Sequence, residues 1–418
     1  MCIRDRNYDI WIEQTSTDRV SFYRLTYTKE TVADILLNLG GYVGTSTMTD
    51  ALVTKVSDTR IEGEFNTTGR FWGGPDNVKI FFAAEFDRPF ENMDGWDGEQ
   101  YFKDVNRLKG KPGSTPRNEG QSYHDAPTAG VSAKYKVNPG DQIKVKFAVS
   151  YTSLENARNN LANEADYWDF DRVKNESRDE WNRWLGKIDV KGGSNDQKIK
   201  FYTDLWHVLM GRSKIDDYSG DYPDYTQGER VGSHTMNARL KVRSVPKDTH
   251  GKSKFHMYNS DAFWLTQWNL NILWGLAWPE ILDEFSASLV QYADNGKLLP
   301  RGPNVGGYSY IMTGCPATPL IVSAYTKGLL SKVDHEHAYE VMKSNHMPGG
   351  MLEVTDHYIN NGYFINNAGR TLEANFQDWS LAQMAGGLGK SEDAEYFLKR
   401  SDGWKKLYNE EAVSYTHL

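Results

Sequence analysis

The stretch from Phe255 to Pro319 brings together the residue types that a sugar-binding site needs. It begins FHMYNSDAFWLTQWNLNILWGLAWPEI and ends LLPRGPNVGGYSYIMTGCPATP. One predicted helical segment holds the carboxylate of Asp261, several carboxamides and four tryptophans: Trp264, Trp268, Trp274 and Trp278. A pyranose offers an apolar C–H face for stacking and hydroxyls for hydrogen bonds, so this composition favours a sugar-binding wall. The alternative is a buried inner helix whose polar groups are satisfied by its neighbours.

Two further carboxylates, Glu373 and Asp378, lie five residues apart in the predicted helix GRTLEANFQDWSLAQ. At this spacing they differ by about 140° around the helix axis, so they need not converge on one ligand. Hydrolysis of a glycosidic bond needs a proton-donating acid and a second carboxylate that acts as base or nucleophile. The sequence alone does not identify which acidic residues form such a pair.

Three other motifs are better explained by structure than by chemistry. The run GGYVG at residues 40–44 lacks a following helix and the GxGxxG spacing, so we predict a tight turn instead of a phosphate loop. His335 and His337 are two residues apart on a predicted helix and point to different faces, which argues against a shared zinc ion. Cys315 has no assignable histidine partner, so we predict a small buried residue near a loop and not a nucleophile.

Length and charge narrow the class of protein. The chain has 418 residues, more than a single hydrophobic core usually needs, so we expect two domains. A net charge of −8 argues against nucleic-acid binding, which requires a basic surface. No run of about 18 apolar residues occurs, so no membrane-spanning segment is predicted. The sequence carries no signal for the oligomeric state.

The elements that must position these residues change character along the chain. Residues 7–152 alternate with a period of two, as in NVKIFFAAEFDRPF and DQIKVKFAVSYT, and this predicts strands of an antiparallel β-sandwich with one buried face. Residues 92–130 are rich in Gly, Asp, Asn and Pro and are predicted to be a long surface excursion. The period becomes helical after Ser153, a predicted N-cap, and residues 153–194 are predicted to connect the two domains.

From residue 195 to residue 412 one helix follows another. Pro279 is predicted to open a helix that Asn295-Gly296 ends, and Asp334 and Ser391 are predicted N-caps. Some of these helices are amphipathic, whereas 261–278 is apolar nearly all round. Alternating wholly buried and half-buried helices favour a double-layered helical toroid over a four-helix bundle.

Both ends of the chain interrupt the neighbouring pattern. MCIRDR at residues 1–6 and VSYTHL at residues 413–418 resemble translated sequencing-adapter read-through, a contaminant of metagenomic assemblies. We therefore expect a non-native leader and a non-native tail that are not part of the native fold. The remaining chain is predicted to be a fragment.

Three segments together resemble glycoside hydrolase family 92: GGYVGTSTMTDALVTKVSDTRIEGEFNTTGRFWGGPDNVKIFFAAEFDRPFE, the 255–319 stretch and GRTLEANFQDWSLAQMAGGLGK. The resemblance covers nearly all of residues 7–411 in order. It implies an inverting, calcium-dependent exo-α-mannosidase that acts on mannose-containing glycans. The implied fold is an N-terminal antiparallel β-sandwich (7–152, partial) joined by helices to an (α/α)6 toroid (195–412, partial). The resemblance further implies a bacterial protein that is secreted, periplasmic or on the cell surface.

The family motifs assign the site residues. The Trp-Asp-Thr-aromatic-Arg sugar-binding motif falls at residues 260–264, where only Asp261 and Phe263 match. Asp261 is therefore the implied ligand of a hydroxyl of the −1 sugar. The Thr-Leu-Glu-Tyr-Ala-Tyr-Asp-Asp-Trp motif falls at residues 371–379 and keeps Glu373 and Asp378, which we expect to orient the pocket, with helix-cap or packing roles as the alternative. Arg301, in the loop LPRGPN, is expected to line the pocket.

The resemblance also implies what this chain lacks. In the family the general acid, the base and most Ca2+ ligands follow the Thr-Leu-Glu segment at a distance beyond residue 418, so we expect no catalytic residue here and no activity of the fragment alone. Two alternatives stay open. One is another (α/α)6 glycosidase or phosphorylase with a β-sandwich partner, and the other is a non-catalytic carbohydrate-binding protein.

Overall fold

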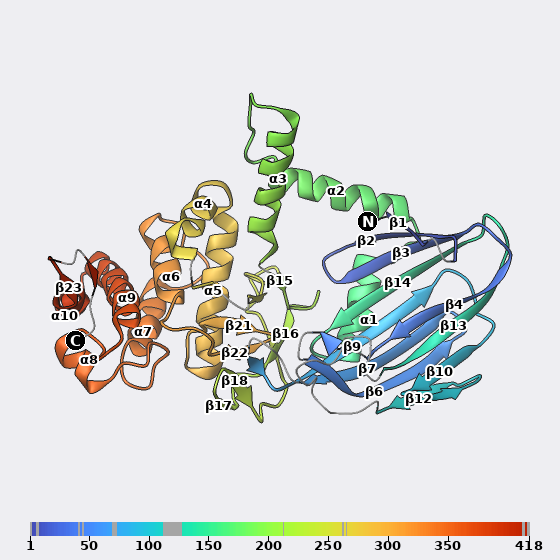
Figure 1. Cartoon of the computed structure of the whole chain (residues 1–418), viewed down its shortest axis with the longest axis horizontal. Coiled ribbons are helices and arrows are strands. Elements are labelled where there is room, and N and C mark those ends of the chain that lie inside the picture. Colours follow the sequence, from blue (N-terminus) through green and yellow to red (C-terminus); the bar gives the residue numbers. More distant parts are fainter. Residues whose placement is uncertain are drawn as a thin grey trace.

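A computed structural model describes residues 2–5, 8–40, 42–43, 46–68, 73–111, 128–211, 213–260, 263–264, 266–411 and 414–415. Figure 1 shows a β-rich part at one end, a helical part at the other end, and α2 and α3 running between them. This is the predicted fold class, with antiparallel β-sheets first and a helical region after them.

The larger sheet of the β-rich part is antiparallel and has nine strands. In spatial order they are β1 (Cys2–Asp5), β2 (Ile10–Ser16), β3 (Val20–Tyr27), β14 (Gln142–Ser150), β9 (Asn77–Phe86), β7 (Arg60–Thr68), β6 (Ser46–Ser57) and β12 (Arg107–Gly110), with β5 (Tyr42–Val43) paired to β6. Residues 2–5, predicted to be a foreign leader, form the edge strand β1 in this structure.

The smaller sheet has four strands and packs face to face on the larger one. Its order is β11 (Gln100–Phe102), β10 (Met93–Asp97), β13 (Ala129–Val137) and β4 (Thr31–Asn38). Strands β10 and β11, the start of β13 and strand β12 of the larger sheet lie in residues 92–130. The prediction of a surface excursion was therefore wrong for 93–97, 100–102, 107–110 and 129–130. Short hairpin strands rich in Gly and Asp show little hydrophobic alternation, so the sequence pattern did not predict them. Residues 112–127 lie outside the described residues.

The larger sheet is buried on both faces, not on one face as its alternation predicted. One face packs on the small sheet, through residues such as Val53, Phe82 and Val145. The opposite face packs on α1 (Leu154–Glu164) and the start of α2 (Phe170–Leu185). Lys146 belongs to the polar side of the alternation in DQIKVKFAVSYT, the side predicted to face solvent. It is nevertheless buried there, and its ammonium group donates to the carbonyl of Ala165 at 2.7 Å. A long side chain can cover apolar surface and still find a polar partner at its tip.

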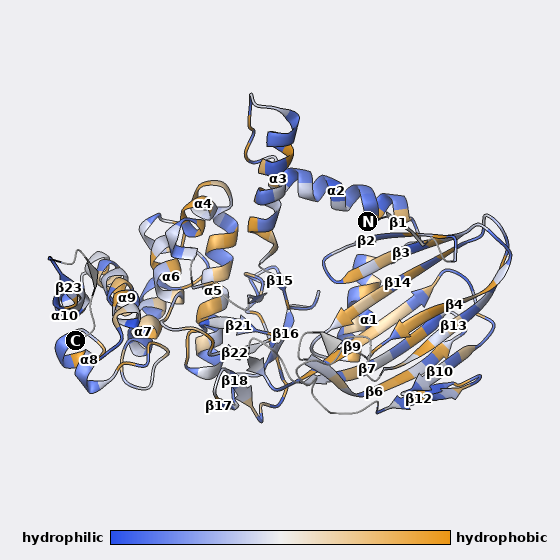
Figure 2. Cartoon of the chain, viewed as in Figure 1, coloured by the Kyte–Doolittle hydropathy of each residue, from blue (hydrophilic) through white to orange (hydrophobic). Residues whose placement is uncertain are grey.

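The helices between the two parts begin where the sequence places caps. Ser153 accepts from the backbone N–H of Asn156 at the start of α1, as predicted. Asp169 caps α2 in the same way, and Ser194 with Gln197 forms a capping box on α3 (Asn195–Met210). In Figure 2 hydrophobic residues concentrate on the sandwich strands, whereas α2 is mostly hydrophilic.

Small strand pairs join the sandwich to the helical part. They are β15 (Ser213–Lys214) with β20 (Tyr258–Asn259), β16 (Asp221–Asp224) with β19 (Lys241–Ser244), β17 (Glu229–Val231) with β18 (His234–Met236), and β21 (Gly302–Asn304) with β22 (Gly307–Ser309). Strand β18 also pairs with β8 (Gly74–Pro75), a segment of the N-terminal part. The chain therefore crosses between the two parts at a hydrogen-bonded junction.

The helical part is a row of paired helices. It contains α4 (Leu270–Ala277), α5 (Pro279–Gly296), α6 (Ala317–Thr326), α7 (His335–Asn345), α8 (Asp356–Asn361), α9 (Ala368–Gly387) and α10 (Ser391–Ser401), with the 3-10 turns η2 (Thr266–Trp268) and η3 (Asp402–Lys406) and the pair β23 (Tyr408–Asn409) and β24 (Ser414–Tyr415). Helix α5 has the predicted bounds, and Asp334 caps α7 as predicted. Ser391 is the first helical residue and not the cap, because Lys390 occupies that position.

The four tryptophans of the 255–319 stretch do not share one helix. Trp268 ends the 3-10 turn η2 and is 73% exposed, Trp274 is buried in α4, and buried Trp278 lies between α4 and α5. Pro279 follows Trp278, and a residue before proline is driven out of the helical conformation, so the helix ends there. Residues 261, 262 and 265 lie outside the described residues.

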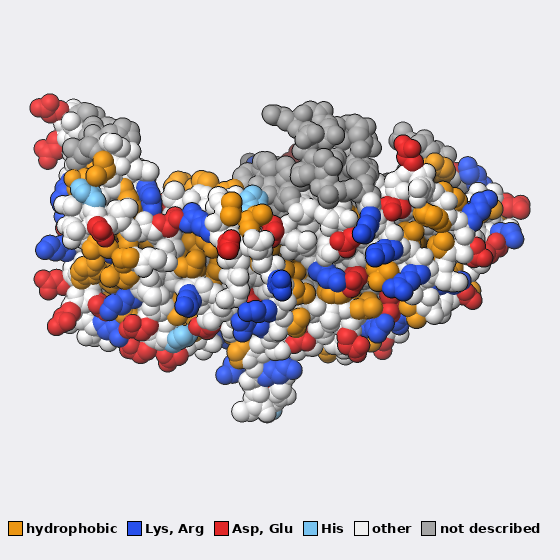
Figure 3. Space-filling model, turned by 90° about the horizontal axis from the view of Figure 1, so that it is seen from below, with side chains coloured by type: hydrophobic (Ala, Val, Ile, Leu, Met, Phe, Trp, Pro, Cys, Tyr) orange, Lys and Arg blue, Asp and Glu red, His pale blue; other side chains and the backbone are white. Residues whose placement is uncertain are grey.

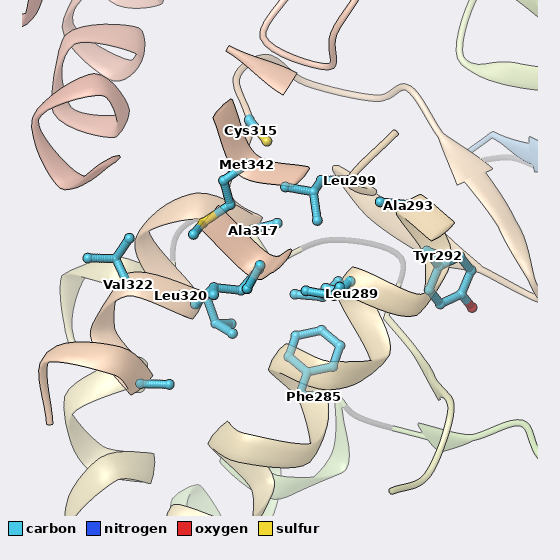
Figure 4. Close-up of a cluster of buried hydrophobic side chains, with 14 of the residues drawn as sticks. Phe285, Leu289, Tyr292, Ala293, Leu299, Cys315, Ala317, Leu320, Val322 and Met342 are labelled. Atoms are coloured by element: carbon cyan, nitrogen blue, oxygen red, sulfur yellow. The ribbon is translucent and has the colours of Figure 1, made fainter. Parts of the chain in front are cut away.

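One large core holds the helical part together. Figure 4 shows Phe285 and Leu289 of α5, Ala317 and Leu320 of α6 and Met342 of α7 pointing toward one another. Apolar contact over whole helix faces is the main source of stability for such an array.

Charge on the surface is mixed in sign. In Figure 3 acidic and basic side chains are interspersed over both parts on the face seen there. None of the described helices combines the length and apolar character needed to cross a bilayer.

The sandwich core gives a first testable prediction. Phe82 is fully buried and stacks on Phe147, with ring centroids 5.2 Å apart. We expect Phe82→Ala to lower the free energy of unfolding by about 3–5 kcal/mol, because it removes apolar contacts and leaves a cavity. The control Phe102→Ala removes a ring that is 38% exposed and should change it by about 0.5 kcal/mol or less. Urea denaturation followed by circular dichroism measures both, and equal losses would contradict this packing.

Candidate functional site

The structure describes four of the five residues predicted to bind substrate. Asp261 lies outside the described residues, so its place is not assigned. Phe263 is buried and packs edge-on against Phe285, with ring centroids 5.3 Å apart. The other three, Arg301, Glu373 and Asp378, belong to two polar networks that meet different faces of α9.

Arg301 is buried and organises two loops. Its Nε donates to the carbonyl of Gly314 at 2.9 Å, and its Nη1 donates to the carbonyls of Tyr310 and Met312 at 3.2 and 2.9 Å. Its Nη2 donates to the carbonyl of Met351 and to Oε2 of Glu353, at 2.8 and 2.9 Å. All five N–H donors of the guanidinium group thus have protein acceptors. Arg301 therefore shapes the site by fixing loops 310–314 and 351–353.

Glu353 is the carboxylate around which three arginines gather. Its side chain accepts from Arg301 and from Arg230, and the carbonyl of Glu353 accepts from Nη2 of Arg370 at 2.7 Å. Arg230 also lies over the ring of Tyr310, 4.5 Å from its centroid. Burial alone would raise the pKa of Glu353, but hydrogen bonds from Arg230 and Arg301 lower it on balance. Glu353 is therefore a fixed negative charge.

The backbone of these loops is held in an uncommon conformation. Met312 and Glu353, which both bond to Arg301, have φ angles of 63° and 54°. A side-chain-bearing residue in this left-handed region costs about 1–3 kcal/mol and persists only where its surroundings enforce it. The bonds from Arg301 supply that enforcement on both loops.

Glu373, on α9, is the second carboxyl of this cluster. It accepts from the hydroxyl of Thr313 and, at 3.4 Å, from Nε2 of Gln377 one helical turn later. Burial raises the pKa of Glu373 above its ordinary value. Glu353 and Glu373 thus differ in electrostatic state, because arginines hold one charged whereas burial favours the protonated form of the other.

Gly314 brings Arg301 and Glu373 together. Its carbonyl is the acceptor for Arg301, and its φ of 75° is one that glycine adopts without strain. A Cβ atom at this position would lie 2.7 Å from Oε1 of Glu373 and 2.6 Å from Nε2 of Gln377. Only glycine allows the loop to approach α9 this closely.

The cluster forms where the two parts of the protein meet. Arg230 comes from the hairpin β17–β18, which pairs with β8 of the N-terminal part. The backbone of Tyr310 donates to the carbonyl of Ser233 in the same hairpin at 3.0 Å. A cavity of about 340 Å³ adjoins the cluster through Arg370, and its other lining residues are Thr355, His357, Phe364, Ile365 and Asn367. Charged hydrogen-bonding groups beside a partly apolar cavity can hold a polyol.

Asp378 lies in a separate network in the helical core. Fully buried, it accepts from Arg400 through Nε at 2.6 Å and Nη2 at 2.5 Å, from Nδ1 of His346 at 2.7 Å and from the hydroxyl of Tyr358 at 2.7 Å. Burial alone would raise the pKa of Asp378, but hydrogen bonds from His346 and Arg400 lower it on balance. This charge connects α9 with α8, α10 and the end of α7.

His346 extends this network toward Cys315. Its Nε2 lies 2.8 Å from the hydroxyl of Thr318, and that hydroxyl also lies 3.6 Å from Sγ of Cys315. Burial lowers the pKa of His346 and raises the pKa of Cys315 to about 11. A thiol with this pKa stays protonated at neutral pH, so the prediction of a small buried cysteine is confirmed.

Sequence reasoning missed several members of the cluster. Arg230, Glu353 and Thr313 lie in loops or short hairpins, where hydrophobic periodicity carries no information. One signal was present for Glu353, because it stands between the apolar pair Met351-Leu352 and Val354 and so interrupts an apolar run. A charged residue directly after buried apolar ones needs a partner, and Arg301 is that partner.

Calcium does not fit the described side chains by themselves. Across the described ranges no group of three or more His, Cys, Asp or Glu side chains is placed to hold a metal ion. Hard cations such as Ca2+ prefer six to eight oxygen ligands.

Comparison with known proteins assigns both parts of the chain to one family. Residues 3–150 match the glycosyl hydrolase family 92 N-terminal domain, and residues 156–417 match the family 92 catalytic domain. A family GH92 alpha-mannosidase from Bacteroides thetaiotaomicron aligns with a TM-score of 0.81 at 21% identity, covering 98% of this chain and 50% of that one. A family GH92 inverting mannosidase from the same species aligns with a TM-score of 0.78 at 19% identity, covering 98% and 51%.

A curated relative is more distant. An uncharacterized secreted glycosidase of Arthroderma benhamiae is 23% identical over 302 residues, which is 66% of this chain and 32% of that protein. The chain thus spans about half the length of the two bacterial mannosidases and less of the fungal protein.

The buried network makes a prediction about stability. We expect Asp378→Asn to lower the free energy of unfolding by about 3–5 kcal/mol, because it leaves Arg400 buried without its counter-charge. The matched control is Asp204→Asn, which removes an exposed carboxylate paired only with Lys200 on α3 and should change stability little. Chemical denaturation followed by tryptophan fluorescence measures both. Equal effects of the two substitutions would show that the network does not hold the helices together.

The lowered pKa of His346 predicts that the stability of the chain depends on pH. Its pKa is lowered in the folded chain, so between about pH 6.5 and its folded pKa only the unfolded chain takes up the proton. The stability that neutral His346 provides is complete above about pH 6.5 and is lost as the pH falls. We therefore expect the difference in melting temperature between the wild type and His346→Asn to shrink between pH 7.5 and pH 5.5. A constant difference would mean that His346 does not titrate differently in the two states.

Proposed function

The chain belongs to glycoside hydrolase family 92, and on this premise we propose that it is part of an inverting exo-α-mannosidase that removes terminal α-linked mannose from N-glycans or mannan. The observation that carries the proposal is the ordered match of the N-terminal and catalytic domains of one family across the chain. The fold is shared with two bacterial family 92 mannosidases over 98% of the chain.

The polar cluster at the junction is suited to binding a sugar ring. Glu353 is a charged acceptor, Glu373 is half-buried with a raised pKa, and Thr313 adds a hydroxyl between loop and helix. Carboxylates and hydroxyls of this kind pair with neighbouring hydroxyls of a sugar. We assign Glu373 the role of a hydroxyl partner, with Asp261, which lies between β20 and η2 in the sequence, as a further one.

Other predicted residues act on the site through their neighbours. Arg301 is a positioning residue, because its donors hold the loops that carry Met312 and Glu353. Asp378 is a positioning residue, because it fixes the helix that carries Glu373. Phe263 packs in the core beside these elements and supports the wall without offering a polar group.

Catalysis requires groups that we expect outside this chain. The general acid, the base and most ligands of calcium are implied by the family to follow the Thr371–Trp379 segment at a greater distance than this chain provides. Each positioned proton-transfer group contributes about 10²–10⁴-fold to the rate, so the chain alone is expected to be inactive. Calcium would supply a positive charge that binds sugar hydroxyls in the longer enzyme.

Membership of the same family also suggests where the longer protein is located. We propose that the longer protein is exported and is secreted, periplasmic or attached to the cell surface. The description of the fungal relative as secreted supports this proposal. Polymeric mannan and N-glycans on other proteins are accessible to an enzyme in these places.

The proposal predicts an activity that depends on calcium. We expect the longer protein, obtained by extending the reading frame of the source DNA across Glu411, to release mannose from α-mannosides and to lose this activity in a chelator. Proton NMR during the first turnovers should show β-mannose, because inversion changes the configuration of an α-linked substrate. The 418-residue chain, assayed in parallel, should release none.

Controls separate the alternatives. A β-mannoside should not be cleaved, and activity that requires phosphate and releases a sugar phosphate would favour a phosphorylase instead. Binding of α-mannosides by the longer protein without any turnover would favour a non-catalytic carbohydrate-binding protein.

A further inference from the structure

The outer face of the four-stranded sheet lies far from the polar cluster. The chain is layered, with α1 and α2 on one face of the large sheet and the small sheet on the other face. Residues such as Val131, Ala133 and Ile35 turn the inner face of the small sheet into the sandwich core. The alternate residues form its outer face, which is open to solvent at Leu36 on β4 (62% exposed) and at Tyr101 on β11 (54% exposed).

Tyr101 is exposed and yet held in place. Its hydroxyl donates to Oδ2 of Asp94, a buried carboxylate that also accepts from Lys134 at 2.7 Å and from the backbone of Asp104 at 2.8 Å. Lys134 lies 5.9 Å from the centroid of the Tyr101 ring. A fixed aromatic ring loses little conformational entropy when a ligand stacks on it.

Trp96 is the second aromatic residue of this face. Its indole N–H donates to the hydroxyl of Thr128 at 2.9 Å. A Cβ on Gly130 would lie 2.7 Å from the Trp96 ring, so the ring lies over a glycine of the neighbouring strand. Glycine at this position leaves the room that the ring occupies.

The sheet register puts these residues in one row across the strands. Trp96 is paired with Tyr101 on one side and with Gly130 on the other, and Gly130 is paired with Asn38 of β4. The next row contains Asp94, Ser132 and Leu36, and the row after it contains Lys134 and Asp34. The exposed ring of Tyr101 and the half-buried ring of Trp96 therefore lie on one face with the exposed side chains of Asp34 and Asn38, whereas Asp94 and Ser132 of the same face are buried.

The charges of this face suit a neutral ligand. Lys134 forms ion pairs with both Asp94 and Asp34, at 2.7 and 3.8 Å, so its charge is already compensated. An ionic partner would have to separate these pairs. A pyranose needs only the ring faces for its C–H groups and the polar side chains for its hydroxyls.

We propose that this outer face, comprising Trp96, Tyr101 and the polar residues beside them, is a second glycan-binding surface that holds an extended chain of pyranose units. It retains a polymer on the sandwich while the polar cluster around Glu353 and Glu373 binds a terminal sugar. The binding surface itself goes beyond the proposed function, whereas the choice of mannan as first probe rests on it.

Affinity electrophoresis of the 418-residue chain tests the surface. Native gels are cast with soluble yeast mannan, xylan or mixed-linkage β-glucan, and migration is compared with that in a gel without polysaccharide. We expect retardation by at least one polymer, and Tyr101→Ala should weaken binding by about tenfold through loss of ring stacking. Tyr101→Phe keeps the ring and should keep most of the retardation.

The matched control is Tyr218→Ala, which removes a tyrosine of similar exposure (55%) from the loop between β15 and β16, beside α1, and should migrate as the wild type does. Melting temperature and gel filtration verify that each variant is folded and has an unchanged oligomeric state. The proposal is overturned if no polymer retards the wild type, or if Tyr101→Ala is retarded equally. A dimer that Tyr101→Ala dissociates would also overturn it, because a second copy would then cover this face. Retardation that persists while the longer protein fails to cleave α-mannosides would contradict the proposed function alone.

Discussion

A buried charge sets the arrangement of the last helices. Asp378 has no access to solvent, and an ionised carboxylate in such a place is tolerated only when several donors replace water. Arg400, His346 and Tyr358 supply four hydrogen bonds, and they come from α10, the end of α7 and α8. These elements cannot shift independently without leaving a charge unpaired. Apolar contacts such as those among Phe285, Leu289 and Leu320 favour a compact state, whereas the charge selects one register among the compact states that those contacts allow.

The buried charge of Asp378 also fixes the helix that carries part of the candidate site. Glu373 precedes Asp378 by five residues on α9, so the two side chains leave the helix in different directions, as the sequence predicted. Asp378 faces the helices behind α9, while Glu373 faces the loop with Thr313 and Gly314. A helix fixed from behind holds Glu373 at a constant distance from the loop that Arg301 organises. The two networks are coupled through the stiffness of α9 and through Gln377, which donates to Glu373 at 3.4 Å and accepts from the backbone N–H of Cys315 at 2.6 Å.

Hydrophobic periodicity predicted the fold better than it predicted the site. Strand β9 and helices α1, α5 and α7 follow from residues such as Val78, Ser153, Pro279 and Asp334, because local pattern and cap chemistry agree with the final packing. Prediction failed where tertiary contacts decide, as at Lys146, which a covering helix buries, and in the hairpin β10–β11, which has little alternation. Glu373 and Asp378 were found through a family motif. Glu353 and Arg230 were not, because an ion pair between distant loops leaves no periodic trace in either segment.

The protein thus has two surfaces that differ in the interactions they offer to a sugar. At the junction, the carboxylates of Glu353 and Glu373 are half-buried, and charge-assisted hydrogen bonds are strong where water is partly excluded. Such a place can select one sugar by the positions of its hydroxyls, but it needs rigid loops, which explains the uncommon backbone angles at Met312 and Glu353. On the outer sheet the charges are paired, the ring of Tyr101 is exposed and the ring of Trp96 is half-buried, so contacts there are weaker and tolerate different sugars. A strong selective site at the junction and a weak permissive one on the sandwich would raise the local concentration of chain ends, because a polymer held at one surface searches for the other within a limited volume.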